Sequence, residues 1–171
     1  NAEGYTVNPV IISPERKKLL NRNLMLFFTG FSRFSSDIQV AAEKNLKSKQ
    51  NQLLEMLSLV DDAEKILTSK TDLEEFGRLL DYTWQLKRGI TDKVSTDSID
   101  AVYSRALQAG ATGGKLLGAG GGGFLLFYVD PDKQENVRKA LENLLYVPFE
   151  FENGGTRVIH YTPESYEPVN A

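Results

Sequence analysis

The chain has 171 residues, of which 41% are hydrophobic and 25% charged, a composition typical of a folded domain rather than a disordered one. Its 20 Lys and Arg against 23 Asp and Glu give a net charge of −3, which excludes a general attraction to nucleic acid or to acidic membranes. The absence of cysteine excludes disulfide scaffolds, thiolate catalysis and cysteine-bearing zinc sites. The length predicts one domain.

The amino-terminal end bears on the extent of the protein. The sequence opens on Asn1 with neither an initiator methionine nor a basic and apolar secretory leader, and no apolar run approaches the roughly 20 residues that span a bilayer. We therefore expect a cytoplasmic protein with no membrane partner, and we expect this chain to be the carboxy-terminal piece of something longer. Residues 1–23 are predicted to be a leading segment from a preceding domain or linker, and residues 24–171 the domain itself.

The first elements follow from caps and apolar spacing. Ser13, followed by Pro14, predicts a short helix through about Leu20. The apolar run Leu24 to Phe28 predicts a buried strand. From Ser36 to about Thr68, recurring apolar residues predict a long helix that a break could divide.

Two further helices precede a glycine-rich segment. Asp72 is predicted to cap a helix that ends near Gly89 and buries the stripe Leu73, Phe76, Leu80 and Trp84. Thr96 is predicted to cap the next, which Gly110 stops and whose inner face holds Ile99, Val102, Tyr103, Ala106 and Leu107.

The last third of the chain predicts a hairpin, a helix and two strands. The helix is expected to start at Asp130 and to bury Val137, Ala140, Leu141, Leu144 and Leu145. Tyr146 to Phe151 and Arg157 to Tyr161 are expected to be strands around the turn Asn153-Gly154-Gly155. This order predicts an α+β fold, a ferredoxin-like split βαβ with an antiparallel sheet and additional helices in the first crossover.

The most informative segment runs from Lys115 to Val129, where five glycines stand among the six residues 118–123, between two strand-like runs. Glycine contributes no packing to a strand, so its concentration indicates that backbone amides approach a small ligand, most plausibly an anion. The segment is a candidate phosphate loop; the alternative is a flexible hairpin turn.

Three better-known glycine motifs fit poorly. Gly118, Gly120 and Gly123 satisfy G-x-G-x-x-G, but a dinucleotide fold needs a helix after them, and Phe124 begins a strand. A Walker A loop fails because the spacing is one residue short and Leu116 occupies the Ser/Thr position. The aromatic strand from Phe124 partly matches an RNA-recognition sheet, but the acidic balance and the missing basic residue weaken that interpretation.

The run Gly114 to Gly123 resembles the third, carboxy-terminal motif of the GHMP small-molecule kinases. Within that family, the sequence is most similar to sugar kinases that phosphorylate D-glycero-D-manno-heptose 7-phosphate at its anomeric hydroxyl. Three other segments support this placement: Thr29 to Arg33, Trp84 to Arg88, and Ile99 to Tyr103. The resemblance extends over nearly the whole chain from Leu24.

The resemblance implies an ATP- and Mg²⁺-dependent sugar kinase whose amino-terminal half is absent from these residues. That half would supply the nucleotide loop, the catalytic Asp and the metal-binding acid, so this chain holds no catalytic residue or metal ligand and should be inactive alone. The expected partners are the missing half and a sugar substrate, with no nucleic acid; a homodimer is left open. The alternatives are a kinase for another sugar such as galactose, a kinase for a mevalonate-like alcohol, and a non-catalytic module that binds a ligand or RNA.

The candidate phosphate- and substrate-binding residues are Gly118, Ala119, Gly120, Gly121, Gly122, Gly123, Lys115, Ser32, Arg33, Lys87 and Arg88. The glycines would donate backbone N–H groups and brace the missing nucleotide loop. Arg33, beside Ser32, has the forked donors that grip a phosphate, although a solvated arginine is an equal alternative. Lys87 and Arg88 also suit a helix C-terminus, and Lys115 a strand surface.

Other polar and aromatic residues favour ordinary roles. Trp84 suits the core better than sugar stacking, and the lone His160 suits a structural or exposed position. Asp61, Asp62 and Glu64 indicate the wet face of a helix rather than a metal site.

Overall fold

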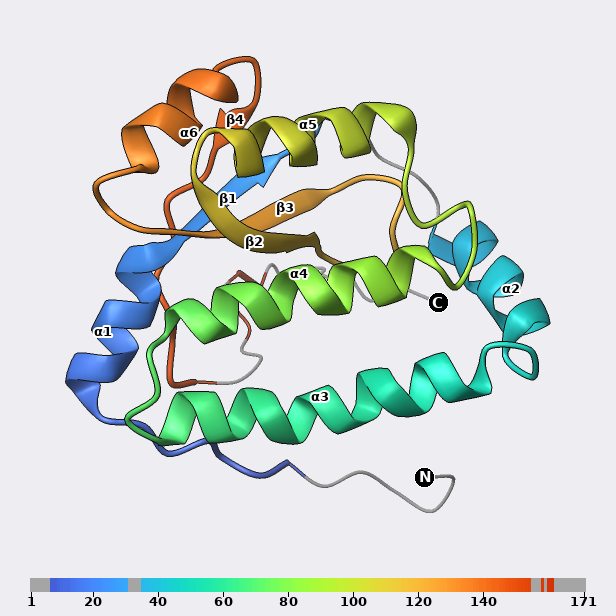
Figure 1. The fold of residues 1–171 in the computed structure, drawn as a ribbon, viewed down its shortest axis with the longest axis horizontal. Helices are drawn as coiled ribbons and strands as arrows, with labels where there is room; N and C mark the ends of the chain where they lie inside the picture. The colour runs from blue at the N-terminus through green and yellow to red at the C-terminus, as the bar shows by residue number, and fades with distance from the viewer. Residues whose placement is uncertain (1–6, 31–34, 155–157, 159, 162–171) are drawn as a thin grey trace, which may run out of the picture.

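The protein is described by a computed structural model that covers residues 7–30, 35–154, 158 and 160–161, and its helices pack around a four-stranded sheet (Figure 1). No helix within these ranges is long and apolar enough to span a bilayer. The elements in chain order are α1 (Pro14–Asn23), β1 (Leu24–Phe28), α2 (Ser35–Asn45), α3 (Gln50–Thr68), α4 (Glu74–Arg88), α5 (Asp97–Gln108), β2 (Ala111–Leu116), β3 (Phe124–Val129), α6 (Gln134–Ala140) and β4 (Leu145–Tyr146).

The sheet has the order β2-β3-β1-β4, and every neighbouring pair is antiparallel. At its centre, Met25 of β1 faces Phe127 of β3, and Phe27 faces Leu125. The predicted α+β class and antiparallel sheet are therefore confirmed. The ferredoxin-like form of the helical crossovers stays a prediction.

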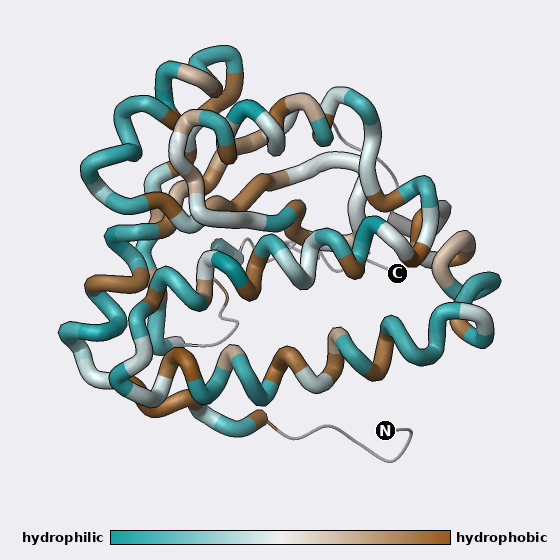
Figure 2. Tube along the Cα trace, viewed as in Figure 1, coloured by the Kyte–Doolittle hydropathy of each residue, from teal (hydrophilic) through white to brown (hydrophobic). Residues whose placement is uncertain are grey.

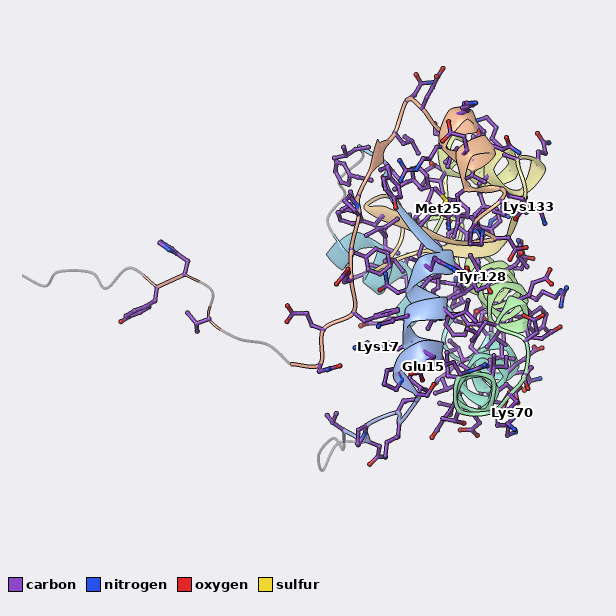
Figure 3. All side chains as sticks on the ribbon, turned by 90° about the vertical axis from the view of Figure 1, so that its left-hand side faces the viewer. Glu15, Lys17, Met25, Lys70, Tyr128 and Lys133 are labelled. Carbon is purple, nitrogen blue, oxygen red and sulfur yellow. The ribbon has the colours of Figure 1, made fainter. Side chains whose placement is uncertain are left out.

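Both faces of the central strands are packed, because side chains alternate along each strand. Met25, Phe27 and Phe127 enter a core that includes Val137 of α6 and Ile99 of α5. On the other face, Tyr128 lies between α1 and α4, as Figure 3 shows. Its hydroxyl accepts a hydrogen bond of 2.6 Å from Asn23, and a Cβ on Gly77 would come within 2.9 Å of its side chain. Glycine at residue 77 therefore lets α4 approach the sheet closely.

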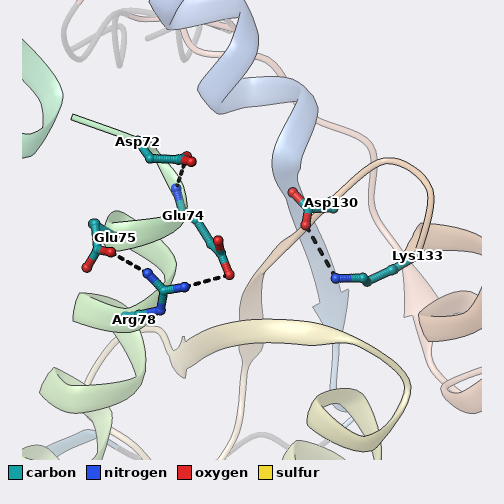
Figure 4. Close-up of polar contacts among 6 residues, drawn as sticks. All are labelled: Asp72, Glu74, Glu75, Arg78, Asp130 and Lys133. Atoms are coloured by element: carbon teal, nitrogen blue, oxygen red, sulfur yellow. Dashed lines mark hydrogen bonds and ion pairs between the residues drawn. The ribbon is translucent and has the colours of Figure 1, made fainter. Parts of the chain in front are cut away.

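The starts of α1 and α5 confirm the caps predicted at Ser13 and Thr96, and Asp72 binds the first amide of α4 one residue before its cap, Leu73. Ser13 and Thr96 each accept a hydrogen bond from the amide three residues later, at 3.2 and 3.3 Å. The Asp72 carboxylate accepts a bond of 2.9 Å from the amide of Glu74, where α4 begins, and Arg78 pairs with acids in the first turn (Figure 4). Sequence spacing alone was sufficient to find these starts.

The predicted long helix is two helices, α2 and α3, separated by turns at residues 46–49. The Asn45 amide group donates a hydrogen bond of 2.8 Å to the carbonyl of Ile90, which ties the end of α2 to the loop after α4. The helical segment is therefore interrupted at the point where the Asn45 side chain binds a distant backbone group.

The first helix is attached to the end of α3 by one side chain. The Arg16 guanidinium donates to the carbonyls of Ile66, Leu67 and Thr71, at 2.5, 2.8 and 2.6 Å. Carbonyls at a helix C-terminus have no partner within the helix, so Arg16 satisfies groups that would otherwise rely on water. The predicted division at residue 24 stays a prediction.

The prediction of two C-terminal strands is wrong for the residues that the structure describes. Only Tyr146 of the first belongs to β4, and Val158, His160 and Tyr161 of the second are in no strand; residues 157 and 159 lie outside the described ranges. After β4 the chain turns to α1, where the Asn21 side chain binds the carbonyl of Phe149 and the amide of Phe151, at 3.1 and 3.0 Å. One asparagine thus substitutes for a strand partner.

The helix expected from Asp130 is shorter than predicted. It begins at Gln134 after a turn closed by a bond of 2.9 Å from the Lys133 amide to the Asp130 carbonyl, and the two side chains also pair (Figure 4). Val137 and Leu141 are buried as expected, but Leu145 lies in β4 and is 65% exposed, so its predicted inward position is wrong.

Candidate phosphate site

The glycine-rich segment forms the loop between β2 and β3. A hydrogen bond of 2.8 Å from the Leu117 amide to the Phe124 carbonyl closes its base. Gly118, Gly120, Gly121 and Gly123 have φ values of 78°, 125°, 71° and 101°. Other residues adopt these angles only under strain, so the loop's path requires the glycines.

Two of the loop's amides are bound within the protein. The Gly121 amide donates to the Val94 carbonyl at 2.9 Å, and the Gly123 amide donates to the Thr29 hydroxyl at 3.1 Å. Among the described residues, the amides of Gly118, Ala119, Gly120 and Gly122 make no hydrogen bond. The capacity of this loop to bind an anion therefore rests on those four N–H groups, while Gly121 and Gly123 hold it in place.

Two lysines lie at the entrance to the loop. The Lys87 ammonium, from the last turn of α4, donates to the Gly118 carbonyl at 2.5 Å and to the Leu116 carbonyl at 3.5 Å. Burial and the nearby Lys115 ammonium lower the pKa of Lys87 to about 8, and burial also lowers the pKa of Lys115. Half-buried cations that repel each other are stabilised by an anion, so this pair favours anion binding beside the free amides.

The Arg88 side chain binds a different segment from the one that Lys87 binds. Its guanidinium lies 2.5 Å from the Asp100 carboxylate, which also accepts a bond of 2.6 Å from the Ser95 hydroxyl. Ser95 follows Val94, whose backbone supports the loop: a Cβ on Gly120 would lie 2.7 Å from the Val94 carbonyl oxygen. Arg88 therefore fixes the segment beneath the glycines. The adjoining 410 Å³ pocket is lined by Asp92, Asp97 and Asp100, which makes it unsuited to an anion.

The remaining candidates separate into three groups. Ser32 and Arg33 lie outside the described residues, so their role stays a prediction. Trp84 is fully buried, with its ring centre 6.1 Å from that of Tyr103, which confirms its place in the core. His160 is exposed, and so are Asp61 and Glu64. Within the described ranges, no cluster of three or more acids and histidines could hold a metal ion.

Sequence reasoning missed the supports of the loop. Val94 and Thr29 lie in segments distant in sequence from the glycines, and although Thr29 begins a segment that supports the family resemblance, neither residue was predicted to contact the loop. Tyr103 is a second case: its hydroxyl lies 2.5 Å from an Asp81 carboxylate oxygen and accepts a bond of 3.1 Å from the Gly114 amide. Apolar spacing predicted only that Tyr103 faces inward. The available signal in the sequence was the tyrosine hydroxyl itself, which stands on an otherwise apolar face of α5.

A family model described as the C-terminal part of GHMP kinases matches residues 56–147, more than half of the chain. The chain belongs to the GHMP kinase family. It is 34% identical over 146 residues to a D-glycero-alpha-D-manno-heptose 7-phosphate kinase of Campylobacter jejuni, which covers 81% of this chain and 43% of that protein. It is 32% identical over 126 residues to a mevalonate kinase of Pyrococcus abyssi, covering 70% of this chain and 37% of that protein.

Solved structures show the same fold. A mevalonate kinase of Methanococcus jannaschii aligns with a TM-score of 0.65 at 23% identity, over 80% of this chain and 42% of its own. A D-glycero-D-manno-heptose 1-phosphate kinase from Bacteroides thetaiotaomicron aligns with a TM-score of 0.58 at 25% identity, over 85% of this chain and 38% of its own. The chain thus spans less than half the length of these relatives.

Proposed function

We propose that this chain is the carboxy-terminal part of an ATP-dependent sugar kinase that phosphorylates a heptose 7-phosphate at its anomeric hydroxyl. The observation that carries the proposal is the glycine loop, with four free amides beside the Lys87 ammonium. In the reaction, the sugar hydroxyl attacks the terminal phosphorus of ATP in line, the bond to ADP breaks, and the hydroxyl proton is released. Such transfer depends on positioning and charge stabilisation, which amides and ammonium groups provide.

The loop leaves room for a ligand beside Gly118, because a Cβ there would meet nothing within 4 Å. We assign the free amides, Lys87 and Lys115 to the oxygens of the transferred phosphoryl group. Arg88 acts as a positioning residue through Asp100, and Ser32 and Arg33 grip the 7-phosphate of the sugar. Bound ATP supplies the phosphoryl group, and Mg²⁺ neutralises charge on its phosphates.

The remaining catalytic groups belong to an amino-terminal half, in this proposal. A row of apolar side chains beside the loop is exposed in this chain. Phe28 pairs with Phe124 on one side and Leu145 on the other, and the last two are 38% and 65% exposed. A second half docked over this row would close the site and exclude water. The chain alone is then inactive. A cytoplasmic location stays part of the proposal.

The substrate is the finer part of the proposal, because mevalonate kinases also match this chain. A coupled ADP-release assay of the full-length protein with heptose 7-phosphate, unphosphorylated heptose, galactose and mevalonate tests it. We expect turnover with the heptose 7-phosphate, and at least 10-fold lower kcat/KM without the 7-phosphate. Turnover of mevalonate or galactose alone would contradict the proposed heptose substrate but would still agree with the proposed kinase class. Activity in the 171-residue chain by itself would contradict the proposal that an amino-terminal half supplies the remaining catalytic groups.

The structure gives little support to an RNA-binding module. Such a sheet stacks bases on aromatic side chains that point to solvent. Tyr128 is only 1% exposed, and the ring of Phe124 packs 5.1 Å from that of Phe28. The aromatic strand thus serves the interior and the apolar row, so the kinase proposal accounts for it better.

A further inference from the structure

One asparagine of the chain is followed directly by glycine, in the segment after β4. Asn153 and Gly154 are both exposed and lie in a bend, in neither a helix nor a strand. Among the described residues, the Gly154 amide makes no hydrogen bond, and a Cβ at Gly154 would meet nothing within 4 Å. The backbone next to the Asn153 side chain can therefore change its dihedral angles without losing a bond or meeting a neighbour.

The side chain of Asn153 contacts one charged group. The Lys17 ammonium of α1 donates a hydrogen bond of 2.6 Å to the Asn153 side-chain oxygen. An ammonium group can only donate, so the contact identifies the oxygen as the amide atom that faces Lys17. Within the described ranges, the amide nitrogen Nδ2 has no hydrogen-bond acceptor. The cation therefore draws electrons away from the amide carbon, while no bond of the described structure retains the nitrogen.

Two other asparagines show what is particular to this arrangement. Asn21 is bound through both atoms of its amide, by backbone groups at 3.1 and 3.0 Å, so its side chain is fixed. Asn143 is exposed in a turn, as Asn153 is in its bend, but Leu144 follows it. A side chain at the following residue restricts the backbone angles through which that residue's nitrogen could reach the asparagine side chain. Asn153 combines a glycine neighbour, exposure and a cation on the amide oxygen.

We propose that Asn153 is a site of spontaneous deamidation and that Lys17 accelerates the reaction. The Gly154 backbone nitrogen attacks the side-chain carbon of Asn153 and loses its proton, and the bond from that carbon to Nδ2 breaks, releasing ammonia. The Lys17 ammonium stabilises the negative charge that develops on the amide oxygen during the attack. Water then opens the resulting five-membered imide at either carbonyl, giving aspartate or isoaspartate. The reaction consumes one water, releases one ammonia and needs no oxidant or reductant.

The reaction changes the contact between α1 and the segment after β4. Both products carry a carboxylate where the neutral amide was, so the hydrogen bond from Lys17 becomes an ion pair, and one added negative charge takes the net charge from −3 to −4. An exposed ion pair stabilises a fold little. Isoaspartate also leads the main chain through the former side-chain carbon, which alters the path of the chain at Gly154. The modification does not depend on kinase activity.

Peptide mass spectrometry of the folded chain, incubated for days at neutral pH, tests the site. We expect the amide of Asn153 to be lost at least about 10-fold faster than that of Asn143 in the same sample, and Gly154→Ala to remove this difference. A methyltransferase that labels only isoaspartate distinguishes opening of the imide from direct hydrolysis, which yields aspartate alone. Retention of the Asn153 amide, or its loss without isoaspartate, overturns the proposal.

A pair of lysine variants tests the role of the cation. α1 has hydrophilic residues before and after its two leucines (Figure 2), and Lys17 and Lys18 are adjacent among them. We expect Lys17→Met to slow the reaction about 3- to 10-fold. The matched control is Lys18→Met, because Lys18 is exposed and makes no bond to Asn153 in the described structure, so the rate should stay within about 2-fold.

Two further measurements make the result of the lysine variants decisive. Circular dichroism confirms that each variant is folded. A synthetic peptide of residues 149–158, which contains Asn153 and Gly154 but not Lys17, gives the rate without the fold. We expect the folded chain to react faster than this peptide, and Lys17→Met to approach the rate of the peptide. A folded chain no faster than the peptide, or a Lys17→Met variant as fast as the original chain, rejects the assigned role of Lys17.

Discussion

Thr29 and Gly123 are 94 residues apart in sequence and are joined by three hydrogen bonds. The amide and hydroxyl of Thr29 donate to the Gly123 carbonyl at 2.8 and 2.9 Å, and the hydroxyl accepts from the Gly123 amide at 3.1 Å. Thr29 is 5% exposed, so water does not replace these bonds easily. The end of β1 thereby fixes the end of the glycine loop.

Thr29→Val is expected to release that end of the loop. It leaves the Gly123 amide without its acceptor, and such a loss costs about 1–3 kcal/mol of the free energy of unfolding. Chemical denaturation measures this cost, and hydrogen exchange at Gly123 should accelerate. Thr29→Ser keeps the hydroxyl and loses only the methyl group, so it is the control; if Thr29→Val is no more damaging than Thr29→Ser, the hydroxyl does not hold the loop.

Substitutions within the loop separate backbone strain from steric contact. Gly120→Ala combines a φ of 125° with a Cβ only 2.7 Å from the Val94 carbonyl oxygen, and we expect it to destabilise the fold by about 2–4 kcal/mol. Gly118→Ala has open space, so only the left-handed backbone opposes it, at about 1 kcal/mol. Thermal and urea denaturation compare the two. If they prove equal, Val94 does not support the loop as described.

Lys87 is expected to titrate near pH 8, which NMR of its ammonium group measures directly. Its pKa in the fold is below the ordinary 10.5, so the unfolded chain binds more protons between pH 8 and 10.5 and this group makes stability rise with pH there. Below pH 8 its contribution is constant.

An anion in the loop favours the ammonium form of Lys87, so pyrophosphate should raise its pKa, and pyrophosphate affinity should fall as pH increases beyond 8. In Lys87→Met, the part of the stability change and of the fall in affinity that Lys87 contributes should disappear, which leaves only the part that Lys115 contributes. A Lys87 pKa that stays constant on adding saturating pyrophosphate would contradict its assignment to the phosphate site.

Asp100→Asn is expected to loosen the segment under the loop. The carboxylate binds both Arg88 and Ser95, and neutralising it weakens the attachment of the residues on which Gly120 and Gly121 rest. Both side chains of the ion pair are about one-third exposed, so the free energy of unfolding should change by less than about 1 kcal/mol. Hydrogen exchange around Val94 should nevertheless accelerate. Asp97→Asn, at the same pocket without an ion pair, should leave exchange unchanged.

Local rules predicted the parts of the fold that local chemistry determines. Thr96 caps its helix as expected because the cap bond joins residues only three apart in sequence. The glycines of the loop were found because the dihedral angles of the loop require them. The site's supports were not predictable, since the bonds from Val94 and Thr29 depend on segments brought together only by the fold. The prediction of the C-terminal strands was wrong for the same reason. The alternating pattern favoured a strand, but the backbone of Phe149 and Phe151 binds the Asn21 side chain instead.

The three carbonyls gathered by Arg16 bear on how this protein can be divided for study. A shorter version starting at Leu24 would remove the guanidinium, strip Leu20 from the buried cluster around Tyr128, and leave the last turn of α3 to be hydrated. Recombinant boundaries placed at the first strand would therefore yield a weakened domain. Cloning should begin upstream of Ser13, so that the helix before the sheet travels with it.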